Sequence, residues 1–437
     1  MIDKTMRSLF YILFCLIGMA FSAACAQSPS PTPLPTTAPL PSPTPEPSLP
    51  TGRIAFITPS GQLATIAPDG TAERTLTSGE TFYQFPAWSP TSNQIAVIGG
   101  GGRGAEQGVF VLADEDESTA VPLFTTGTPI YLYWSPNGQQ VSFIANHPRG
   151  LALHIAPADG QAASDVLTTG QPLYWQWLAD NEQALTHASS GVLAYVDVTG
   201  MVNPLPLGGD GFFQAPALSA DGRYLAYSDK AADESDGGRA LFVYDNEPAQ
   251  TLHQSRHLGV LAMSWSPTAA QLAYTSPTEN RPTSFGPLQL YDVATGASTV
   301  LVAERVLAFF WSPDGRQIAY LAVSNENNQQ AKVGEQAKAA VQPIQQTDEI
   351  YLTLNVLEVA TGGIRPLYTF QPTRLFVNQF LPYFDQYALS HRLWSPDSQF
   401  VVLPVQGEAT SEIVVVPIDG RAPIPVAAGL SAFWSYE

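Results

Sequence analysis

A short motif built around Trp-Ser-Pro recurs along this chain, and its spacing is the strongest constraint on the fold. The clearest copy is FFWSPDGRQIAY, at residues 309–320. Aligned on the Trp or its equivalent, the copies lie at positions 88, 134, 177, 218, 265, 311, 394 and 434. Successive separations are 46, 43, 41, 47, 46, 83 and 40 residues. A period in the forties, with short alternating strands, predicts a β-propeller with one blade per repeat.

Read alone, the stretch at 309–320 has the side chains of a catalytic site, because it holds an indole, a hydroxyl and a carboxylate. Its recurrence favours a blade corner, in which an inner strand ends at the Trp and a tight turn leads into the next strand. Pro presets φ in such a turn, Asp caps it locally and Gly accepts the left-handed conformation. The Trp is large and apolar, so we expect it to pack between neighbouring blades.

The two ends of the chain body complement each other. Residues 53–56 have a second-strand pattern with no Trp before it, whereas Trp434 is a corner with no strand after it. We expect the last strand to pair with the first as the innermost strand of a shared blade, which leaves no open edge at the seam. The predicted fold class is all-β, a single β-propeller of four-stranded antiparallel blades. Eight corners predict eight blades, and seven is the alternative if the weak copy at Trp177 is misread.

The repeat resembles the WD40-like (PD40-type) repeat of TolB and its relatives, in which W-S-P-D-G is followed by I-A-Y or I-A-F. The resemblance covers about residues 52–437. It implies a propeller in an extracytoplasmic compartment and a protein partner. TolB has an α/β domain before its propeller, and a Pro-rich segment stands in that place here. Prolyl-oligopeptidase-type enzymes also carry propellers, but no segment of this chain has the length of their hydrolase domain.

Residues 1–24 have the pattern of a signal peptide, with two basic residues before an apolar run at 9–21. The following Ser22-Ala23-Ala24-Cys25 resembles a bacterial lipobox, in which Cys25 becomes the lipidated first residue. Ser22 departs from that pattern, since Leu is usual there. The alternatives are ordinary cleavage after Ala26, giving a secreted or periplasmic protein, and an uncleaved anchor. We expect an extracytoplasmic protein with a lipid anchor in the cell membrane or cell envelope, which makes it a bacterial lipoprotein.

Residues 25–51 read as a tether. Ten of the 24 residues from 27 to 50 are Pro, and most of the others are Ser or Thr. Pro fixes φ and removes hydrogen-bond donors, so this segment predicts a semi-rigid spacer between a membrane and the propeller at 52–437. The only cysteines are Cys15 and Cys25, so the body of the protein has no disulfide. The formal charge of −19 argues against nucleic acid and anionic membrane surfaces as partners.

Adjacent strands run in opposite directions, so the corner turns share one face of the propeller. The loops from second to third strands, and those leading into each Trp strand, lie on the other face. These loops are long and varied, and insertions at 324–349 and 371–390 belong to them. Because binding residues concentrate in loops held by a rigid scaffold, we predict that this long-loop face binds the partner.

Aromatic residues supply the candidate binding residues on that face. The 371–390 insertion either packs its aromatics onto the rim or presents them as a platform for a protein or glycan. These residues are Phe376, Phe380, Tyr383, Phe384 and Tyr387.

The strands that enter the corners add further candidates at the mouth of the central channel. Core packing is the competing interpretation for their aromatic residues. These residues are Tyr131, Trp175, Phe309, His391 and Arg392.

The sequence predicts no catalytic residue, metal site or cofactor. His253 and His257 have i, i+4 spacing, which brings two ligands together only on a helix, and this region reads as strand. The acidic runs at 114–117 and 233–236 lack the full spacing of a calcium loop and read as solvated loops. We predict a monomeric scaffold that binds a protein or polysaccharide. The alternative is a glycan-active hydrolase or lyase, which needs carboxylates or His residues converging at the channel mouth.

Overall fold

The computed structural model describes residues 51–101, 106–127, 129–189, 192–207, 214–230, 239–279, 283–324 and 350–437. The predicted signal peptide, Cys25, the tether up to residue 50 and nearly all of the 324–349 insertion lie outside the described residues. The chain divides into two units, Met1–Ser48 and Leu49–Glu437, and the second unit holds every described element.

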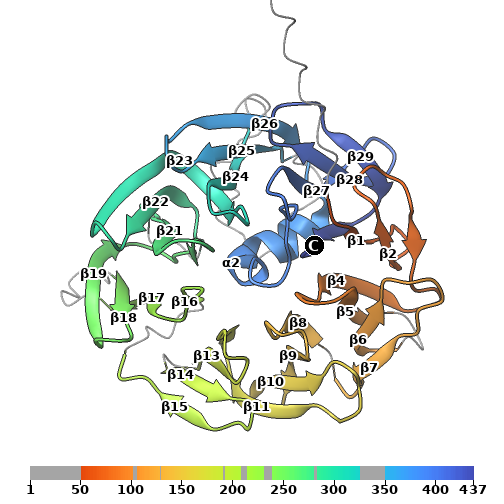
Figure 1. The fold of residues 1–437 in the computed structure, drawn as a ribbon, viewed down its shortest axis with the longest axis horizontal. Helices are drawn as coiled ribbons and strands as arrows, with labels where there is room; N and C mark the ends of the chain where they lie inside the picture. Colours follow the sequence, from red (N-terminus) through yellow and green to blue (C-terminus); the bar gives the residue numbers. More distant parts are fainter. Residues whose placement is uncertain are drawn as a thin grey trace, which may run out of the picture. The chain divides into compact units, whose positions relative to one another are not determined.

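Antiparallel sheets of short strands follow one another in chain order around a ring (Figure 1). Four-stranded sheets make up the first part of the ring. Their strands are β1 (Ile54–Ile57), β2 (Leu63–Ile66) and β3 (Arg74–Thr75), joined by β30 (Ser431–Trp434); β4 (Phe82–Trp88), β5 (Gln94–Gly100), β6 (Gly108–Ala113) and β7 (Val121–Phe124); β8 (Pro129–Trp134), β9 (Gln140–His147), β10 (Gly150–Pro157) and β11 (Asp165–Gly170); β12 (Leu173–Trp177), β13 (Gln183–Ala188), β14 (Val192–Asp197) and β15 (Val202–Pro204); and β16 (Ala217–Leu218), β17 (Tyr224–Lys230), β18 (Arg239–Asp245) and β19 (Gln250–His257).

The rest of the ring contains a seven-stranded sheet, a three-stranded sheet and the helical segments of the 371–390 insertion. These elements are β20 (Met263–Trp265), β21 (Gln271–Thr275), β22 (Gly286–Asp292), β23 (Ala297–Trp311), β24 (Gln317–Val323), β25 (Leu352–Glu358) and β26 (Ile364–Phe370); β27 (Phe400–Gln406), β28 (Ser411–Pro417) and β29 (Ile424–Ala428); and η2 (Phe376–Phe380), η3 (Leu381–Tyr383) and α2 (Phe384–Tyr387).

The long strand β23 explains the seven-stranded sheet. Its first part pairs with β22, and its last part, from Val306 to Trp311, pairs with β24. The strand is therefore the outer strand of one blade and the inner strand of the next. The three-stranded sheet gains an inner position through the bridge between Trp394 and Val401. The long sheet therefore spans two successive predicted blades, which divide inside β23.

The chain ends meet as predicted. β30 pairs antiparallel with β1, placing Trp434 opposite Ile54 and Ser431 opposite Ile57. The strand that ends the chain thus completes the sheet that begins it.

The corner tryptophans link neighbouring blades, as expected from their size and position. At five corners the indole N–H donates a hydrogen bond to the carbonyl oxygen just before the corner position of the preceding blade. Trp134 reaches Ala87 at 2.9 Å, and Trp394 reaches Phe310 at 3.0 Å. The equivalent bonds of the other three corners join Trp88 to Phe433, Trp265 to Ala217 and Trp311 to Ser264.

Two corner tryptophans depart from this pattern. The indole N–H of Trp434 is buried without a hydrogen-bond partner among the described residues, and that of Trp177 is bonded through a relay. The hydroxyl of Ser142, on β9, accepts the indole N–H of Trp177 at 2.9 Å and that of Trp175 at 2.8 Å. It donates in turn to the carbonyl oxygen of Tyr133 at 2.7 Å, the group that a direct corner bond would reach. Ser142 is 1% exposed. This buried hydroxyl therefore relays the corner bond and also holds the second indole.

The Ser-Pro-Asp-Gly stretch of the corner holds its own turn. The Ser312 hydroxyl donates to the Asp314 carboxylate at 2.6 Å and accepts the backbone N–H of Gln317 at 3.0 Å. Gly315 has φ of +69°, which a residue with a side chain adopts only under strain. In the sequence, the Ser312 hydroxyl and the Asp314 carboxylate resemble a catalytic pair. In the structure, both form hydrogen bonds within the hairpin turn.

Candidate functional site

The 371–390 insertion lies in the middle of the ring, where Figure 1 shows α2. Phe376, Phe380 and Phe384 are four residues apart and Tyr387 follows three later, so in consecutive helical turns all four rings share one face. This spacing indicates a helical segment with one aromatic face, which the number of aromatic residues alone does not indicate. It turns the insertion into a plug with one apolar side.

The plug is held by ring contacts with the inner strands. Phe380 packs against Phe433 with ring centroids 5.6 Å apart, and Phe384 packs edge-on against Phe309 at 5.4 Å. Phe376, Phe380, Phe384 and Phe309 are at most 3% exposed. As a platform for a partner, these four residues are therefore wrong candidates, because the core covers their rings. Core packing is the correct interpretation for them.

His391 is also buried, in a chain of hydrogen bonds that ties the plug to β4 and β8. Its Nδ1 lies 2.6 Å from the Ser390 hydroxyl, and its Nε2 lies 3.1 Å from the carbonyl oxygen of Phe85. The Ser390 hydroxyl also lies 2.7 Å from that of Tyr131. Burial lowers the pKa of His391 to about 4, so the imidazole is neutral at pH 7. With Nε2–H donating to Phe85, Nδ1 accepts the Ser390 proton.

This Ser–His pair resembles a nucleophile with its general base, but Ser390 and His391 are 3% and 1% exposed. No substrate reaches groups covered to that extent, so the pair positions the plug. Arg392 lies apart from it, with its guanidinium carbon 3.7 Å from the centre of the Tyr436 ring. Arg392 thus holds the last residues of the chain in place, and neither His391 nor Arg392 lines the pocket described next.

A pocket of about 770 Å³ opens between the plug and the blades built from β8–β11 and β12–β15. It is formed at the ends of β8 and β12 away from their Trp corners, and at the hairpin between β9 and β10. This is the predicted long-loop face. Four of the sequence candidates line it together, and they are Tyr131, Trp175, Tyr383 and Tyr387. The volume is in the range of clefts that hold small ligands.

Buried aromatic rings form the floor of the pocket. Tyr131 packs edge-on against Trp175, with ring centroids 5.2 Å apart, and against Tyr387 at 5.1 Å. Gln386 locks this floor to the blade, since its Nε2 donates to the carbonyl oxygen of Trp175 at 3.2 Å. Its own backbone oxygen accepts the Tyr131 hydroxyl at 2.8 Å. The floor is therefore rigid and prepared before any ligand arrives.

Amide side chains form the rim. Asn146, Gln171, Asn378 and Gln379 line the pocket and are exposed, and Gln84 lines it half-buried. Sequence reasoning missed all five, because isolated Asn and Gln residues give no signal until the fold brings them together from four separate segments. The described lining contains no Asp, Glu, His, Lys or Arg. In a protein of net charge −19, the pocket is locally neutral.

One ionisable group lies close to the rim without lining the pocket. Asp385 is the second residue of α2, two positions after Tyr383, and is half-buried. Desolvation raises the pKa of its carboxyl to about 7. The carboxyl therefore carries only part of its charge at neutral pH.

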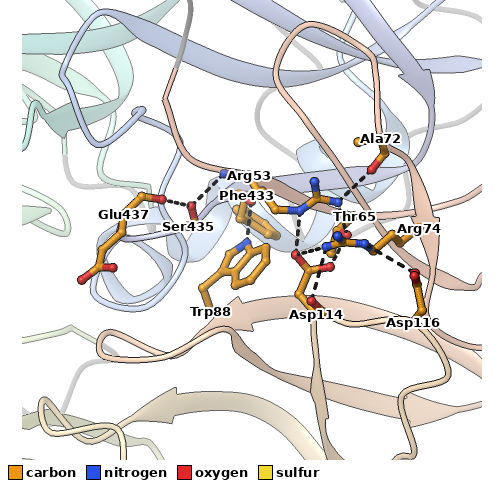
Figure 2. A network of polar contacts seen from close by, with 10 residues as sticks. All are labelled: Arg53, Thr65, Ala72, Arg74, Trp88, Asp114, Asp116, Phe433, Ser435 and Glu437. Atoms are coloured by element: carbon orange, nitrogen blue, oxygen red, sulfur yellow. Dashed lines mark hydrogen bonds and ion pairs between the residues drawn. The ribbon is translucent and has the colours of Figure 1, made fainter.

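In the acidic run at 114–117, Asp114 differs from the solvated loop that we predict, whereas residues 115–117 are exposed. The carboxylate of Asp114 lies 2.6 Å from Nε of Arg53 and 3.3 Å from Nη1 of Arg74, and it accepts the Thr65 hydroxyl at 2.6 Å (Figure 2). Its side chain is 3% exposed. The backbone N–H of Arg53 donates to Ser435 at 2.9 Å. Asp114, which follows β6, thus joins the sheet of β4–β7 to the neighbouring sheet of β1, β2, β3 and β30.

Neither His253 nor His257 lines the pocket described above. His253 and His257 lie on strand β19, where His253 stacks on Tyr291 at 4.4 Å. No group of three or more metal-binding side chains occurs in the described parts of the chain. The run at 233–236 lies outside the described residues. Among the described helices, none is long and apolar enough to cross a membrane.

No protein-family model and no curated protein sequence matches the chain. Among solved structures, it is similar to dihydro-heme d1 dehydrogenase NirN in complex with DHE at 12% identity, covering 91% of this chain and 78% of that one, with a TM-score of 0.56. A eukaryotic initiation factor is similar at 13% identity over 88% and 98% of the two chains, with a TM-score of 0.50. TolB from Acinetobacter baumannii gives 14% identity, 81% and 82% coverage, and a TM-score of 0.37.

Identities this low concern the fold alone. Together with the ring of antiparallel sheets, the two structures with TM-scores of 0.50 and 0.56 support the predicted all-β propeller fold.

Proposed function

We propose that this protein is an extracytoplasmic, membrane-tethered β-propeller that binds a ligand in the pocket between the plug and the blades of β8–β15. The observation that carries the proposal is the pocket itself. A rigid aromatic floor and an exposed polar rim meet on the long-loop face, which is the arrangement expected of a preformed ligand site.

Binding is favoured over the hydrolase or lyase alternative by the chemistry of the lining. Glycoside cleavage needs two carboxyl groups flanking the scissile bond, and proton abstraction needs a base within hydrogen-bond reach of the substrate. The described residues that line the pocket supply neither.

Tethering is proposed from the sequence, through lipidation of Cys25 and the Pro-rich spacer that follows it. The spacer would hold the propeller away from the membrane and leave the long-loop face free for a ligand. Replacing Cys25 by Ala should release the protein into the soluble fraction. Retention of the Cys25→Ala protein in washed membranes would contradict the lipid anchor.

The absence of Cys from the body makes the binding proposal directly testable, because a single introduced Cys can carry an environment-sensitive dye. We would label Asn378→Cys at the rim, in a mature chain with Cys25→Ala. The matched control is Ser92→Cys, exposed at a corner turn on the opposite face. The test panel contains neutral oligosaccharides, acidic oligosaccharides and peptides.

The proposal expects at least one class to change the fluorescence at residue 378 saturably, with no change at residue 92. A panel that changes neither dye, or only the dye at residue 92, would overturn it.

A further inference from the structure

We infer that the ligand of this pocket is a neutral oligosaccharide, an inference that rests on the proposed function and names its ligand class. Three properties of the lining support a neutral sugar: its amide rim, its one exposed aromatic ring, and its lack of ionised groups among the described residues.

The rim matches the hydrogen-bonding chemistry of sugars. A sugar hydroxyl donates one hydrogen bond and accepts others, and a side-chain amide offers an acceptor and two donors in one plane. Asn146, Gln171, Asn378 and Gln379 place such amides around the opening, on both the blade side and the plug side. A ligand with several hydroxyls can therefore both donate hydrogen bonds to these amides and accept hydrogen bonds from them. It meets no charged side chain in the described lining.

Tyr383 and Ile130 supply the apolar part of the opening. Both line the pocket, and they are 43% and 42% exposed, which is unusual in a chain whose other aromatics near the plug are buried. The faces of aromatic rings carry negative charge density, so they attract weakly positive C–H groups. Sugar rings present C–H groups on their faces and hydroxyls at their edges, which fits an apolar wall beside an amide rim.

Anionic ligands fit this pocket poorly. Carboxylates and phosphates are usually bound by Arg or Lys, often in bidentate pairs. The described lining has neither residue, and the protein carries a net charge of −19. An acidic oligosaccharide would lose hydration on entering and gain no ion pair.

Peptide binding by strand addition is also disfavoured. That mode needs free backbone groups along a strand edge. On β12 the carbonyl oxygen of Trp175 is already bonded to Gln386, and the plug covers this position. The groups left free at the opening are side-chain amides, which suit hydroxyls.

The test is a titration of the mature, unlabelled protein by calorimetry. The probes are cellotetraose, maltotetraose, tetra-N-acetylchitotetraose, tetragalacturonate and a blocked alanine tetrapeptide. We expect one or more of the neutral sugars to bind at least tenfold more tightly than tetragalacturonate and the peptide. The Kd of the neutral sugar should stay within twofold between 50 and 300 mM NaCl, because no ion pair is formed.

Rim variants locate the interaction. Tyr383→Ala and Gln379→Glu should each weaken binding of the neutral sugar about tenfold, the effect of losing one well-placed contact. Gln139→Glu adds the same charge to the exposed corner turn between β8 and β9, outside the pocket lining, and should change the Kd less than twofold. Circular dichroism confirms that each variant is folded.

The outcomes separate this inference from the proposed function. If tetragalacturonate or the peptide binds and changes the dye at residue 378, the ligand class is wrong and the binding site stands. If a neutral sugar binds but Gln139→Glu weakens it as much as Gln379→Glu, the pocket is wrong. If no neutral sugar binds while the dye at residue 378 responds to another class, the inference is refuted. If nothing in the panel binds, both proposals fail.

Discussion

Replacing Ser142 by Ala tests how neighbouring blades are held together. The hydroxyl accepts two buried indole N–H groups, at 2.8 and 2.9 Å, and donates to a carbonyl oxygen at 2.7 Å. Alanine leaves both indole donors without a partner at a position that is 1% exposed. Each buried unsatisfied donor costs about 1–3 kcal/mol, so we expect the free energy of unfolding to fall by about 4 kcal/mol.

Urea unfolding at pH 7, followed by circular dichroism, measures this loss. The midpoint should fall with an unchanged m-value, since the surface exposed on unfolding is the same. Thr186→Val is the matched control, on strand β13, which pairs with the β12 strand that carries Trp175 and Trp177. It removes one buried hydroxyl whose only described bond is to the carbonyl oxygen of Ala194, at 3.1 Å, and should cost about 1 kcal/mol. A loss below 1 kcal/mol for Ser142→Ala would refute the relay.

Three further predictions concern charged and titrating groups. Asp114→Asn should lower the free energy of unfolding by about 2 kcal/mol, because two arginines lose a buried partner while keeping part of their surface in water. The control Asp116→Asn, 90% exposed, should change it by less than about 0.5 kcal/mol, and equal effects in urea unfolding would contradict the seam contact. The folded pKa of His391, about 4, lies below its unfolded value, so its contribution is complete above pH 6.5 and is lost as the pH falls toward 4. Wild type should lose about 2–3 kcal/mol more than His391→Gln between pH 7 and pH 4.5, and parallel pH profiles would argue against a neutral buried imidazole. The folded pKa of Asp385, about 7, lies above its unfolded value, so the stability it provides is present below pH 4 and is lost as the pH rises through 7. The free energy of unfolding of Asp385→Asn should therefore exceed that of wild type by about 2 kcal/mol at pH 8 and equal it at pH 4, as measured by thermal unfolding. A value below that of wild type at pH 8 would contradict a raised pKa for Asp385.

The fold could be predicted because its information is local and repeated. Each corner carries its own turn residues, so a copy such as Trp311 to Gly315 identifies a blade without knowledge of its neighbours. The pairing of β30 with β1 followed from what each chain end lacks. The Ser142 relay could not be predicted, since it depends on how closely two strands approach when their contacting residues are 33 and 35 positions apart in sequence.

The site was only partly predictable, for a physical reason. The long-loop face and four lining aromatics follow from strand direction and residue type. The amide rim does not, because Gln171 and Asn378 are about 200 residues apart and only the folded ring brings them together. The burial of Phe376, Phe380 and Phe384 was available from their four-residue spacing, which indicates a helix with one apolar face.

Hydrogen exchange of the mature protein, with and without a bound neutral oligosaccharide, tests whether the ligand site lies between the plug and the blades of β8–β15. The account predicts slower amide exchange in peptides covering residues 129–131, 171–175 and 376–387, with no change at the corner turns. Protection confined to the corner turns, or spread evenly around the ring, would contradict a ligand site between the plug and the blades of β8–β15.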